Sequence, residues 1–222
     1  MRKIVIVGAG GFGREILWVI RRVNAVNAQF DVVGFCDDAA DMQSGVYAGL
    51  PLLGSVEDVC RTMSDIAFIC AVGNNRARKD VFSRFDKSDV RSVSIIDPTA
   101  VIADNVVIGD GCFVGINSVV SVDCNIGSGV IINHNVTVGH DVKVQNFAQL
   151  CPGVCVSGGC EIGEGALLGT LAGTIPLKHI GAWATLGAGV TALRNVAEGT
   201  SMIRLGTSAG KSEVSTQDGQ VI

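Results

Sequence analysis

An apolar residue returns at every sixth position of this chain over ninety residues, and this period constrains the fold more than any other feature. The series has sixteen positions, all aliphatic except Thr174: Ile96, Ile102, Ile108, Val114, Val120, Ile126, Ile132, Val138, Val144, Leu150, Val156, Ile162, Leu168, Thr174, Ile180 and Leu186. A period of six fits neither an α-helix nor an ordinary β-strand. It is typical of a solenoid in which each hexapeptide forms one flat side and one corner around an aliphatic core.

Small or β-branched residues follow the aliphatic positions four places later in all but one repeat, and Cys112, Cys124 and Cys160 occupy this second position. We interpret these cysteines as compact apolar fillers of the core. The chain has eight cysteines but no Cys-x-x-Cys pair, and no cysteines have a histidine at zinc-binding spacing. We therefore expect neither disulfides nor a metal site.

The first ninety-odd residues alternate between expected strands and helices. Strands are expected at residues 4–7, 32–36 and 66–72. Helices are expected after the first strand to about Val23, at 56–63 and at 76–85. This alternation predicts a small parallel sheet with helices on both faces.

The composition changes near Asp97-Pro98, where the period of six begins, and again at Thr191, where we expect the register to end. We divide the chain into a Rossmann-like α/β domain at residues 1–94, a β-helix at 95–206 and a polar tail at 207–222.

Charge and hydropathy exclude several classes of function. The formal net charge is −4, and residues 95–190 contain only two cations, Lys143 and Lys178, against seven carboxylates. We therefore expect no nucleic-acid partner. No apolar run approaches the length of a membrane span, and the first residues lead directly into a strand without a signal-peptide pattern. We expect a cytoplasmic enzyme.

The segment after the first expected strand is a candidate phosphate-binding loop. Gly8, Gly10 and Gly13 form a Gly-x-Gly-x-x-Gly motif between a strand and a helix, where the backbone can approach a phosphate. Asp37 and Asp38 end the second strand, where carboxylates can bond to a ribose or base. The alternative is a tight turn with a solvated acidic loop. Because the repeats begin too early for a second βαβ half, we expect a mononucleotide-type ligand rather than NAD.

The three histidines all lie in the repeats. His134 and His140 each stand two places after an aliphatic position, at corners that face outward, and Asp141 follows His140. A histidine beside a carboxylate can act as a general base near neutral pH. The alternative for each histidine is a solvated surface side chain.

Residues 1–206 resemble the bacterial sugar acetyltransferases of the NeuD/PglD type, and six segments carry the resemblance: residues 7–13, 34–38, 71–75, 139–142, 146–147 and 152–153. This resemblance implies a Rossmann-like nucleotide domain joined to a left-handed parallel β-helix with three hexapeptides per coil. Sixteen repeats then give about five coils, stacked at roughly 4.8 Å. It also implies a homotrimer that uses acetyl-CoA.

The resemblance further implies roles for single residues. His140 is the general base, and Asp141 orients it. The implied nucleotide-sugar contacts are Gly10, Gly11, Phe12, Gly13, Asp37, Asp38, Gly73 and Asn74. Gln149 is expected near the acetyl-CoA. Apart from the resemblance, Lys178 and Arg204 are cations near enough in sequence to neutralise the CoA phosphates, and the backbone N–H of Gly158, one coil after His140, is a candidate oxyanion donor.

Three positions depart from the family pattern. Gln149 stands where relatives often have a histidine, and His134 stands where they often have a small or polar residue. The family's Gly-x-Pro-Ala ending is degraded at residues 205–211. The contacts of the acyl donor and of the CoA adenine are therefore expected to differ.

Taken together, these features predict an acetyl-CoA-dependent N-acetyltransferase of a nucleotide-linked amino sugar, for a surface polysaccharide or glycan. An O-acetyltransferase of a free sugar such as a sialic acid needs the same base and is the nearest alternative. A non-catalytic assembly solenoid is disfavoured by the His140-Asp141 pair. Outward apolar residues on the flat sides predict a surface that three subunits would bury, among them Phe113, Val119, Ile131 and Leu167.

Overall fold

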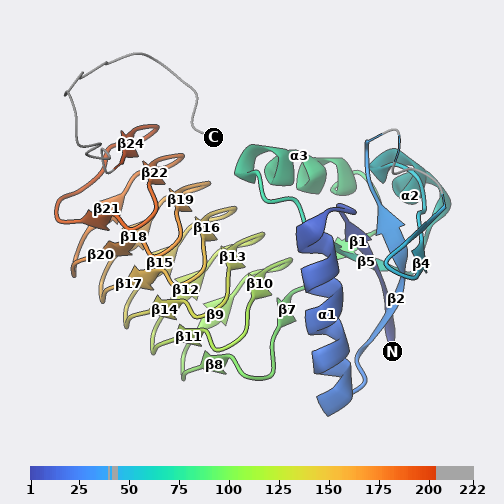
Figure 1. Ribbon diagram of the computed structural model, residues 1–222, viewed down its shortest axis with the longest axis horizontal. Helices are drawn as coiled ribbons and strands as arrows, with labels where there is room; N and C mark the ends of the chain where they lie inside the picture. Colours follow the sequence, from blue (N-terminus) through green and yellow to red (C-terminus); the bar gives the residue numbers. More distant parts are fainter. Residues whose placement is uncertain (40, 42–44, 204–222) are drawn as a thin grey trace, which may run out of the picture.

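The computed structural model describes residues 1–39, 41 and 45–203, which form two units lying side by side (Figure 1). The N-terminal unit contains a parallel four-stranded sheet in the order β2-β1-β5-β6. Its strands are β1 (Arg2–Val7), β2 (Phe30–Cys36), β5 (Ala67–Cys70) and β6 (Arg91–Ser92). Its helices are α1 (Gly11–Val26), α2 (Val56–Thr62) and α3 (Asn75–Phe85).

The strand β1 divides this unit into two apolar layers because its side chains alternate between the sheet faces. Ile4 and Ile6 pack in one cluster with the apolar residues of α1. Val5 and Val7 pack in another with residues of α2 and α3. Helices therefore cover both faces of the sheet, as predicted.

Two local features of this unit differ from the expectation. The helix α1 ends at Val26, three residues beyond the predicted end. The segment before Pro51 forms a short antiparallel hairpin, β3 (Val46–Tyr47) with β4 (Leu50–Pro51), which lies outside the three expected strands. The glycine at position 34 lets this hairpin approach β2, because a Cβ there would lie 2.6 Å from the Pro51 carbonyl oxygen.

The second unit is a left-handed parallel β-helix with three flat sheets (Figure 1). The seven-stranded sheet contains β7 (Ile95–Ile96), β10 (Phe113–Val114), β13 (Ile131–Ile132), β16 (Gln149–Leu150), β19 (Leu167–Leu168), β22 (Thr185–Leu186) and β24 (Ser201–Met202). The six-stranded sheet contains β8 (Val101–Ile102), β11 (Val119–Val120), β14 (Thr137–Val138), β17 (Cys155–Val156), β20 (Gly173–Thr174) and β23 (Thr191–Ala192). The five-stranded sheet contains β9 (Val107–Ile108), β12 (Asn125–Ile126), β15 (Lys143–Val144), β18 (Glu161–Ile162) and β21 (His179–Ile180).

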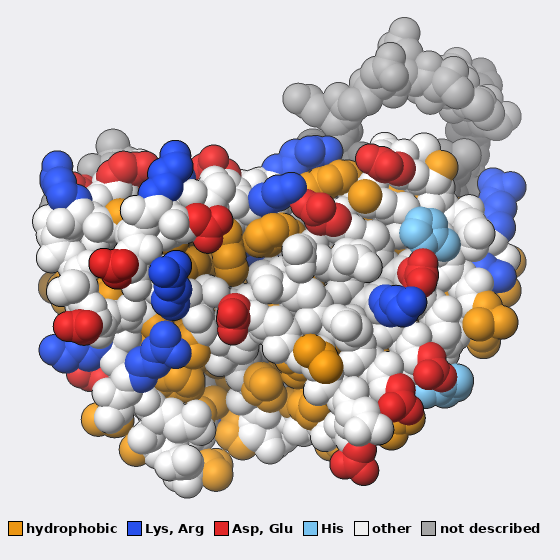
Figure 2. Space-filling view, turned by 180° about the vertical axis from the view of Figure 1, so that it is seen from behind, with side chains coloured by type: hydrophobic (Ala, Val, Ile, Leu, Met, Phe, Trp, Pro, Cys, Tyr) orange, Lys and Arg blue, Asp and Glu red, His pale blue; other side chains and the backbone are white. Residues whose placement is uncertain are grey.

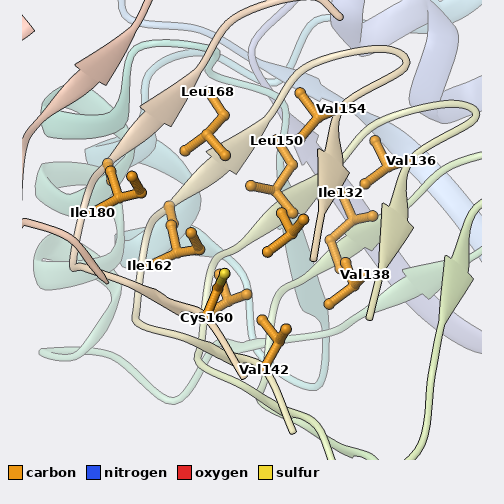
Figure 3. Packing of buried hydrophobic residues seen from close by; sticks show 14 of the residues in the cluster. Ile132, Val136, Val138, Val142, Leu150, Val154, Cys160, Ile162, Leu168 and Ile180 are labelled. Atoms are coloured by element: carbon orange, nitrogen blue, oxygen red, sulfur yellow. The ribbon is translucent and has the colours of Figure 1, made fainter. Parts of the chain in front are cut away.

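Each solenoid strand turns its second residue into a narrow core, where Ile132, Leu150 and Leu168 stack in successive coils (Figure 3). The cysteines predicted as fillers, Cys112 and Cys160 among them, are buried and free. Burial raises the pKa of Cys112 to about 11, so its thiol stays protonated and apolar at neutral pH.

The solenoid continues past the point where the register was expected to end. Thr191 begins β23, Val196 bridges to Ile180, and Met202 pairs with Leu186. The last two pairings join residues sixteen apart, whereas earlier coils pair residues eighteen apart. The chain therefore forms about six coils rather than five, and the pattern missed the last because that coil is two residues shorter.

The helix α1 covers the seven-stranded sheet at its first coils. Ile95, Phe113 and Ile131 belong to the same buried cluster as the core-facing residues of α1, and Phe12 meets Phe113 edge to face at 5.4 Å. Phe113 and Ile131 were expected to face a partner subunit. That expectation was wrong for these two residues, because the chain's own N-terminal unit buries them.

An ion pair joins α1 to the start of the solenoid. The Asp97 carboxylate is buried and accepts hydrogen bonds from Arg22 Nε at 2.7 Å and from the Thr99 hydroxyl at 2.6 Å. Burial opposes ionisation of Asp97, but these hydrogen bonds outweigh it and lower its pKa. The folded carboxylate is therefore stabilised above its ordinary pKa, and the contribution is lost as pH falls through the lowered value.

We expect Asp97→Asn to lower the free energy of unfolding by about 2 kcal/mol at pH 7, the size of a hydrogen bond to a charged group. The difference from wild type should shrink as pH falls below about 4, where the unfolded carboxyl takes up its proton. Urea unfolding followed by circular dichroism measures both effects. The exposed carboxylate of Asp104 gives a matched control, Asp104→Asn; an equal loss in both variants would contradict the assignment.

Candidate active site

His140 and Asp141 form a pair at the corner between β14 and β15. His140 Nδ1 lies 2.7 Å from Asp141 Oδ2, and both side chains are 66% exposed. Asp141 has a left-handed φ of 59°, and its N–H bonds to the Val122 carbonyl, which fixes the turn. When the Nδ1–H group donates a hydrogen bond to the carboxylate, Nε2 is unprotonated. Its lone pair can then accept a proton from a substrate.

Gly158 lies one coil later, against the imidazole of His140. A Cβ placed on Gly158 would be 2.6 Å from His140 Nε2. Because Gly158 has no side chain, the imidazole of His140 can occupy this space. Among the described residues, the Gly158 N–H finds no acceptor, so it remains available to an oxygen of a ligand.

His134 occupies the other corner that was predicted, and both its nitrogens are engaged. Nδ1 accepts a hydrogen bond from the Ile116 N–H at 2.9 Å, and Nε2 lies 2.5 Å from Glu15 Oε1 on α1. The ring also meets Phe113 edge to face at 6.0 Å. These contacts favour a structural role in joining the two units over a catalytic one.

The glycine loop between β1 and α1 has the geometry that its motif predicts. Gly8 has a left-handed φ of 105°, and a Cβ on Gly13 would lie 2.2 Å from the Gly8 carbonyl oxygen. Gly13 thus permits close packing of helix and strand. Gly10 and Gly11 are exposed, and the Gly10 carbonyl accepts a hydrogen bond from the Tyr47 hydroxyl at 3.1 Å.

The carboxylates after β2 are engaged within the domain. Asp37 Oδ2 accepts the Ala9 N–H at 2.7 Å, which ties it to the glycine loop. Asp38 accepts two hydrogen bonds from Arg84, at 2.6 and 3.1 Å, which hold its pKa below the ordinary value. A ribose or base would have to share these oxygens. Arg84 also forms an ion pair with Glu57. The sequence pattern did not indicate that Arg84 is part of this site.

Two hollows lie at the carboxyl ends of β1 and β5. A cavity of about 170 Å³ is lined by residues that include Gly8, Asp37, Asp38 and Arg84. A second, of about 200 Å³, lies between the loop after β5 and the solenoid, and Gly73 and Asn74 line it. Four of the eight predicted nucleotide-sugar residues, Asp37, Asp38, Gly73 and Asn74, therefore border one of these two hollows.

Two further predicted residues have clear local roles. Asn74 caps α3, because its side-chain oxygen accepts the N–H groups of Arg76 and Ala77 at 3.0 Å each. Phe12 is half-buried against Phe113 in the seam between the units, beside the glycine loop.

The predicted acetyl-CoA residues do not form one group within the chain. Gly158 lies at the same corner as His140, one coil later. Lys178 follows this corner after one further coil. Gln149 lies on the seven-stranded sheet under α3, with its side-chain oxygen 3.5 Å from Arg78 Nη1. Arg204 and the tail at 207–222 lie outside the described residues.

The glycine loop and His140 occupy different sides of the molecule. The N-terminal unit packs on the seven-stranded sheet, whereas His140 lies at the corner between the six- and five-stranded sheets. The strands of the five-stranded sheet carry polar side chains at their outer positions, among them Lys143, Glu161 and His179. Figure 2 shows charged and histidine side chains together on this side of the solenoid. A single chain therefore does not bring the predicted nucleotide residues to the predicted base.

The part of the chain that the structure describes lacks two features, a metal-binding cluster and a membrane-spanning helix. It contains no cluster of three or more acidic, histidine or cysteine side chains that could hold a metal. None of its helices has the length and apolarity needed to cross a bilayer.

Comparison with known proteins identifies relatives for both units. Residues 3–85 match the family model described as the PglD N-terminal domain. The UDP-N-acetylbacillosamine N-acetyltransferase of Bacillus subtilis is 32% identical over 108 residues, and this alignment spans 46% of each protein. The match thus covers about half the length of that curated relative.

Solved structures match nearly the whole chain. Perosamine N-acetyltransferase from Caulobacter crescentus, as a histidine variant in complex with CoA and GDP-perosamine, is 27% identical with a TM-score of 0.82, covering 91% of this chain and 93% of that one. The acetyltransferase domain of PglB from Neisseria gonorrhoeae is 28% identical with a TM-score of 0.83, covering 92% and 97%. The latter domain has also been solved with acetyl coenzyme A. Residues 3–85 therefore resemble the PglD N-terminal domain, and nearly the whole chain shares its fold with these sugar acetyltransferases.

Proposed function

We propose that this protein is an acetyl-CoA-dependent N-acetyltransferase that acts on a nucleotide-linked amino sugar. The main support is the His140-Asp141 pair, whose Nδ1 contact leaves Nε2 as a base. The relatives that match over more than nine-tenths of the chain include an enzyme crystallised with CoA and GDP-perosamine, one form of it a histidine variant. A base, an acyl donor and an amino-sugar acceptor are the three components that this reaction requires.

The proposed reaction needs no covalent enzyme intermediate. The amine nitrogen of the sugar attacks the thioester carbonyl carbon of acetyl-CoA, and His140 Nε2 accepts the proton that the nitrogen loses. The imidazolium is stabilised by Asp141 at 2.7 Å. The tetrahedral intermediate collapses as the C–S bond breaks, and the CoA thiolate leaves and is protonated. The Gly158 N–H is the proposed donor to the carbonyl oxygen while it carries negative charge.

Gly158→Ala tests how closely the imidazole must be placed. The added Cβ would meet His140 Nε2 at 2.6 Å, and the ring, rather than backbone, would have to move. We expect kcat to fall about 10²-fold, the cost of misplacing a catalytic group by about 1 Å. Steady-state assays against Gly187→Ala give the comparison, because a Cβ at Gly187 first meets the Ile203 side chain at 3.2 Å. Unchanged kcat in Gly158→Ala would contradict this placement.

The proposed assembly is a homotrimer, in which a site forms between two chains. The outer positions of the six-stranded sheet carry no charge: Val101, Val119, Thr137, Cys155, Gly173 and Thr191. This uncharged surface borders the His140 corner, so a partner packed there would bring its own N-terminal domain to the base. Two other residues predicted to face outward are accessible in the single chain. Val119 is 37% exposed, and Leu167 is half-buried.

We place the enzyme in the cytoplasm and in the synthesis of a surface polysaccharide or glycan. All eight cysteines are free, as is usual in a reducing compartment. The named relatives act on UDP-bacillosamine and GDP-perosamine derivatives, which are nucleotide-linked sugars.

Incubation with acetyl-CoA and a panel of nucleotide-linked amino sugars tests the proposed reaction. Mass spectrometry should detect a sugar product that carries one added acetyl group. One equivalent of free CoA should be released with it. Treatment with mild alkali separates the two products, because it releases an acetyl group held as an ester and leaves one held as an amide. Acetylation of free sialic acid but of no nucleotide-linked amine would overturn the proposal in favour of an O-acetyltransferase.

A further inference from the structure

Arg78 is the largest fully buried side chain in the described part of the protein, at 0% exposure. It lies on α3 and reaches into the seam between the units. Arg78 Nε donates to the Gly129 carbonyl at 2.8 Å, and Nη2 donates to the Phe147 carbonyl at 2.7 Å. Both carbonyls belong to corners of the solenoid in successive coils. Arg78 therefore fastens α3 to the β-helix.

The remaining donors of Arg78 hold the loop that follows β5. Nη1 donates to the carbonyls of Val72 and Gly73, at 2.9 and 3.3 Å, and Nη2 donates to Asn75 Oδ1 at 3.0 Å. The five N–H groups of a guanidinium are thus all directed at neutral oxygens. A single side chain sets the position of this loop relative to the solenoid.

The charge of Arg78 has no carboxylate partner among the described residues. Burial lowers its pKa to about 10, which still leaves the guanidinium protonated at neutral pH. Burying a charge without a counter-ion is costly, and well-packed apolar residues commonly replace buried ionic groups without loss of stability. Stability alone therefore does not account for an arginine here.

The loop held by Arg78 forms one wall of the 200 Å³ hollow. Asn75 Nδ2 donates across to the Gly165 carbonyl at 3.0 Å, and the Arg76 guanidinium lies 4.3 Å from the centre of the Trp183 ring. Gly165 and Trp183 line the opposite wall. The width of the hollow and the direction of the Gly73 backbone therefore depend on Arg78.

We propose that Arg78 is a positioning residue for the diphosphate of the nucleotide-linked substrate. It holds the loop at residues 73–75 in the conformation that receives the diphosphate, and its uncompensated charge makes that region attractive to an anion. The inference rests on the proposed function. It assigns the diphosphate of the nucleotide-linked sugar, the acetyl acceptor, rather than that of CoA, because the loop follows a parallel strand, the place where open α/β sheets bind ligands. Arg78 itself does not touch the ligand.

The test uses the full-length chain and calorimetric titration with UDP, GDP and acetyl-CoA. Arg78→Lys keeps the charge but loses the planar fork, and we expect its Kd for the preferred nucleoside diphosphate to rise about tenfold. Arg78→Gln also loses the charge, and its Kd should rise about 30-fold, the size of an interaction between charges several ångströms apart near a protein surface. The Kd for acetyl-CoA should change less than twofold in both.

The neighbouring variant Lys79→Met is the matched control. Lys79 also crosses from α3 to the solenoid, through an exposed ion pair with Glu164 at 2.5 Å, and such pairs contribute little. Its nucleotide affinity should match wild type. Equal loss of nucleotide and acetyl-CoA affinity, or unchanged affinity in folded Arg78→Lys, would overturn the role. If Arg78→Gln does not fold, Arg78→Lys decides. Failure of wild type to bind UDP or GDP would instead overturn the substrate class as well.

Discussion

Replacing His140 with alanine should lower kcat by roughly 10²–10⁴-fold, the range that a general base contributes. The loss should fall on kcat because we propose that His140 Nε2 acts on the attacking amine and that the nucleotide binds the other domain. The imidazole is 66% exposed, and within the described part of the chain it bonds only to its neighbour Asp141. The midpoint of thermal unfolding and the Kd for acetyl-CoA should therefore remain near the wild-type values.

His179→Ala is a matched control for this result. His179 is also an exposed solenoid histidine, and its Nδ1 lies 3.5 Å from a carboxylate oxygen of Glu161. It lies on the flat five-stranded sheet rather than at the His140 corner, so its loss should leave kcat within about twofold. Near-wild-type turnover in a folded His140→Ala protein, measured by release of the CoA thiol, would remove His140 from the mechanism.

The solenoid was predictable because its environment repeats. Except for Thr174, the inward positions from Ile102 to Leu186 are aliphatic and stack on residues eighteen places away, so the pattern appears in the sequence alone. The pair of His140 with Asp141 was predictable for a simpler reason, since adjacent residues at a corner must lie close together. The last coil is shorter by two residues, and a search for a fixed period does not reveal it.

Contacts between distant segments were not predictable. Phe113 and Ile131 occupy outward positions, and nothing in the repeat indicates that α1 covers them rather than another subunit. Asp38 ends a strand as the motif requires, but its ion pair is made by Arg84, 46 residues later. Arg78 likewise carries no local signal, because its partners are backbone carbonyls of the solenoid and of its own loop.

Two inactive variants should restore each other's activity when their chains are mixed. One is His140→Ala, which lacks the base. The other is Gly11→Val, which blocks the approach of a phosphate to the glycine loop. Gly11 suits this purpose because a Cβ there contacts only the end of the Arg14 side chain, at 3.9 Å, whereas one at Gly13 would collide with backbone. The second variant should therefore fold and retain its His140.

Rescue is expected because one chain places the glycine loop over the seven-stranded sheet and His140 at the corner away from it. In a trimer, a functional site would combine His140 from one chain with the N-terminal domain of its neighbour. Random mixing of equal amounts should then give about one quarter of the wild-type activity, the share of interfaces that join the two intact halves. Native mass spectrometry of the mixture establishes that the chains have exchanged.

The same experiment separates a shared site from a site within one chain. If loop and base served the same chain, every mixed assembly would remain inactive, since each chain carries one defect. Exchange without rescue would therefore contradict the shared site while leaving His140 as a base. A monomeric mass in light scattering would contradict the trimer itself. In that case the uncharged outer surface of the six-stranded sheet, from Val101 to Thr191, would need a different partner to cover it.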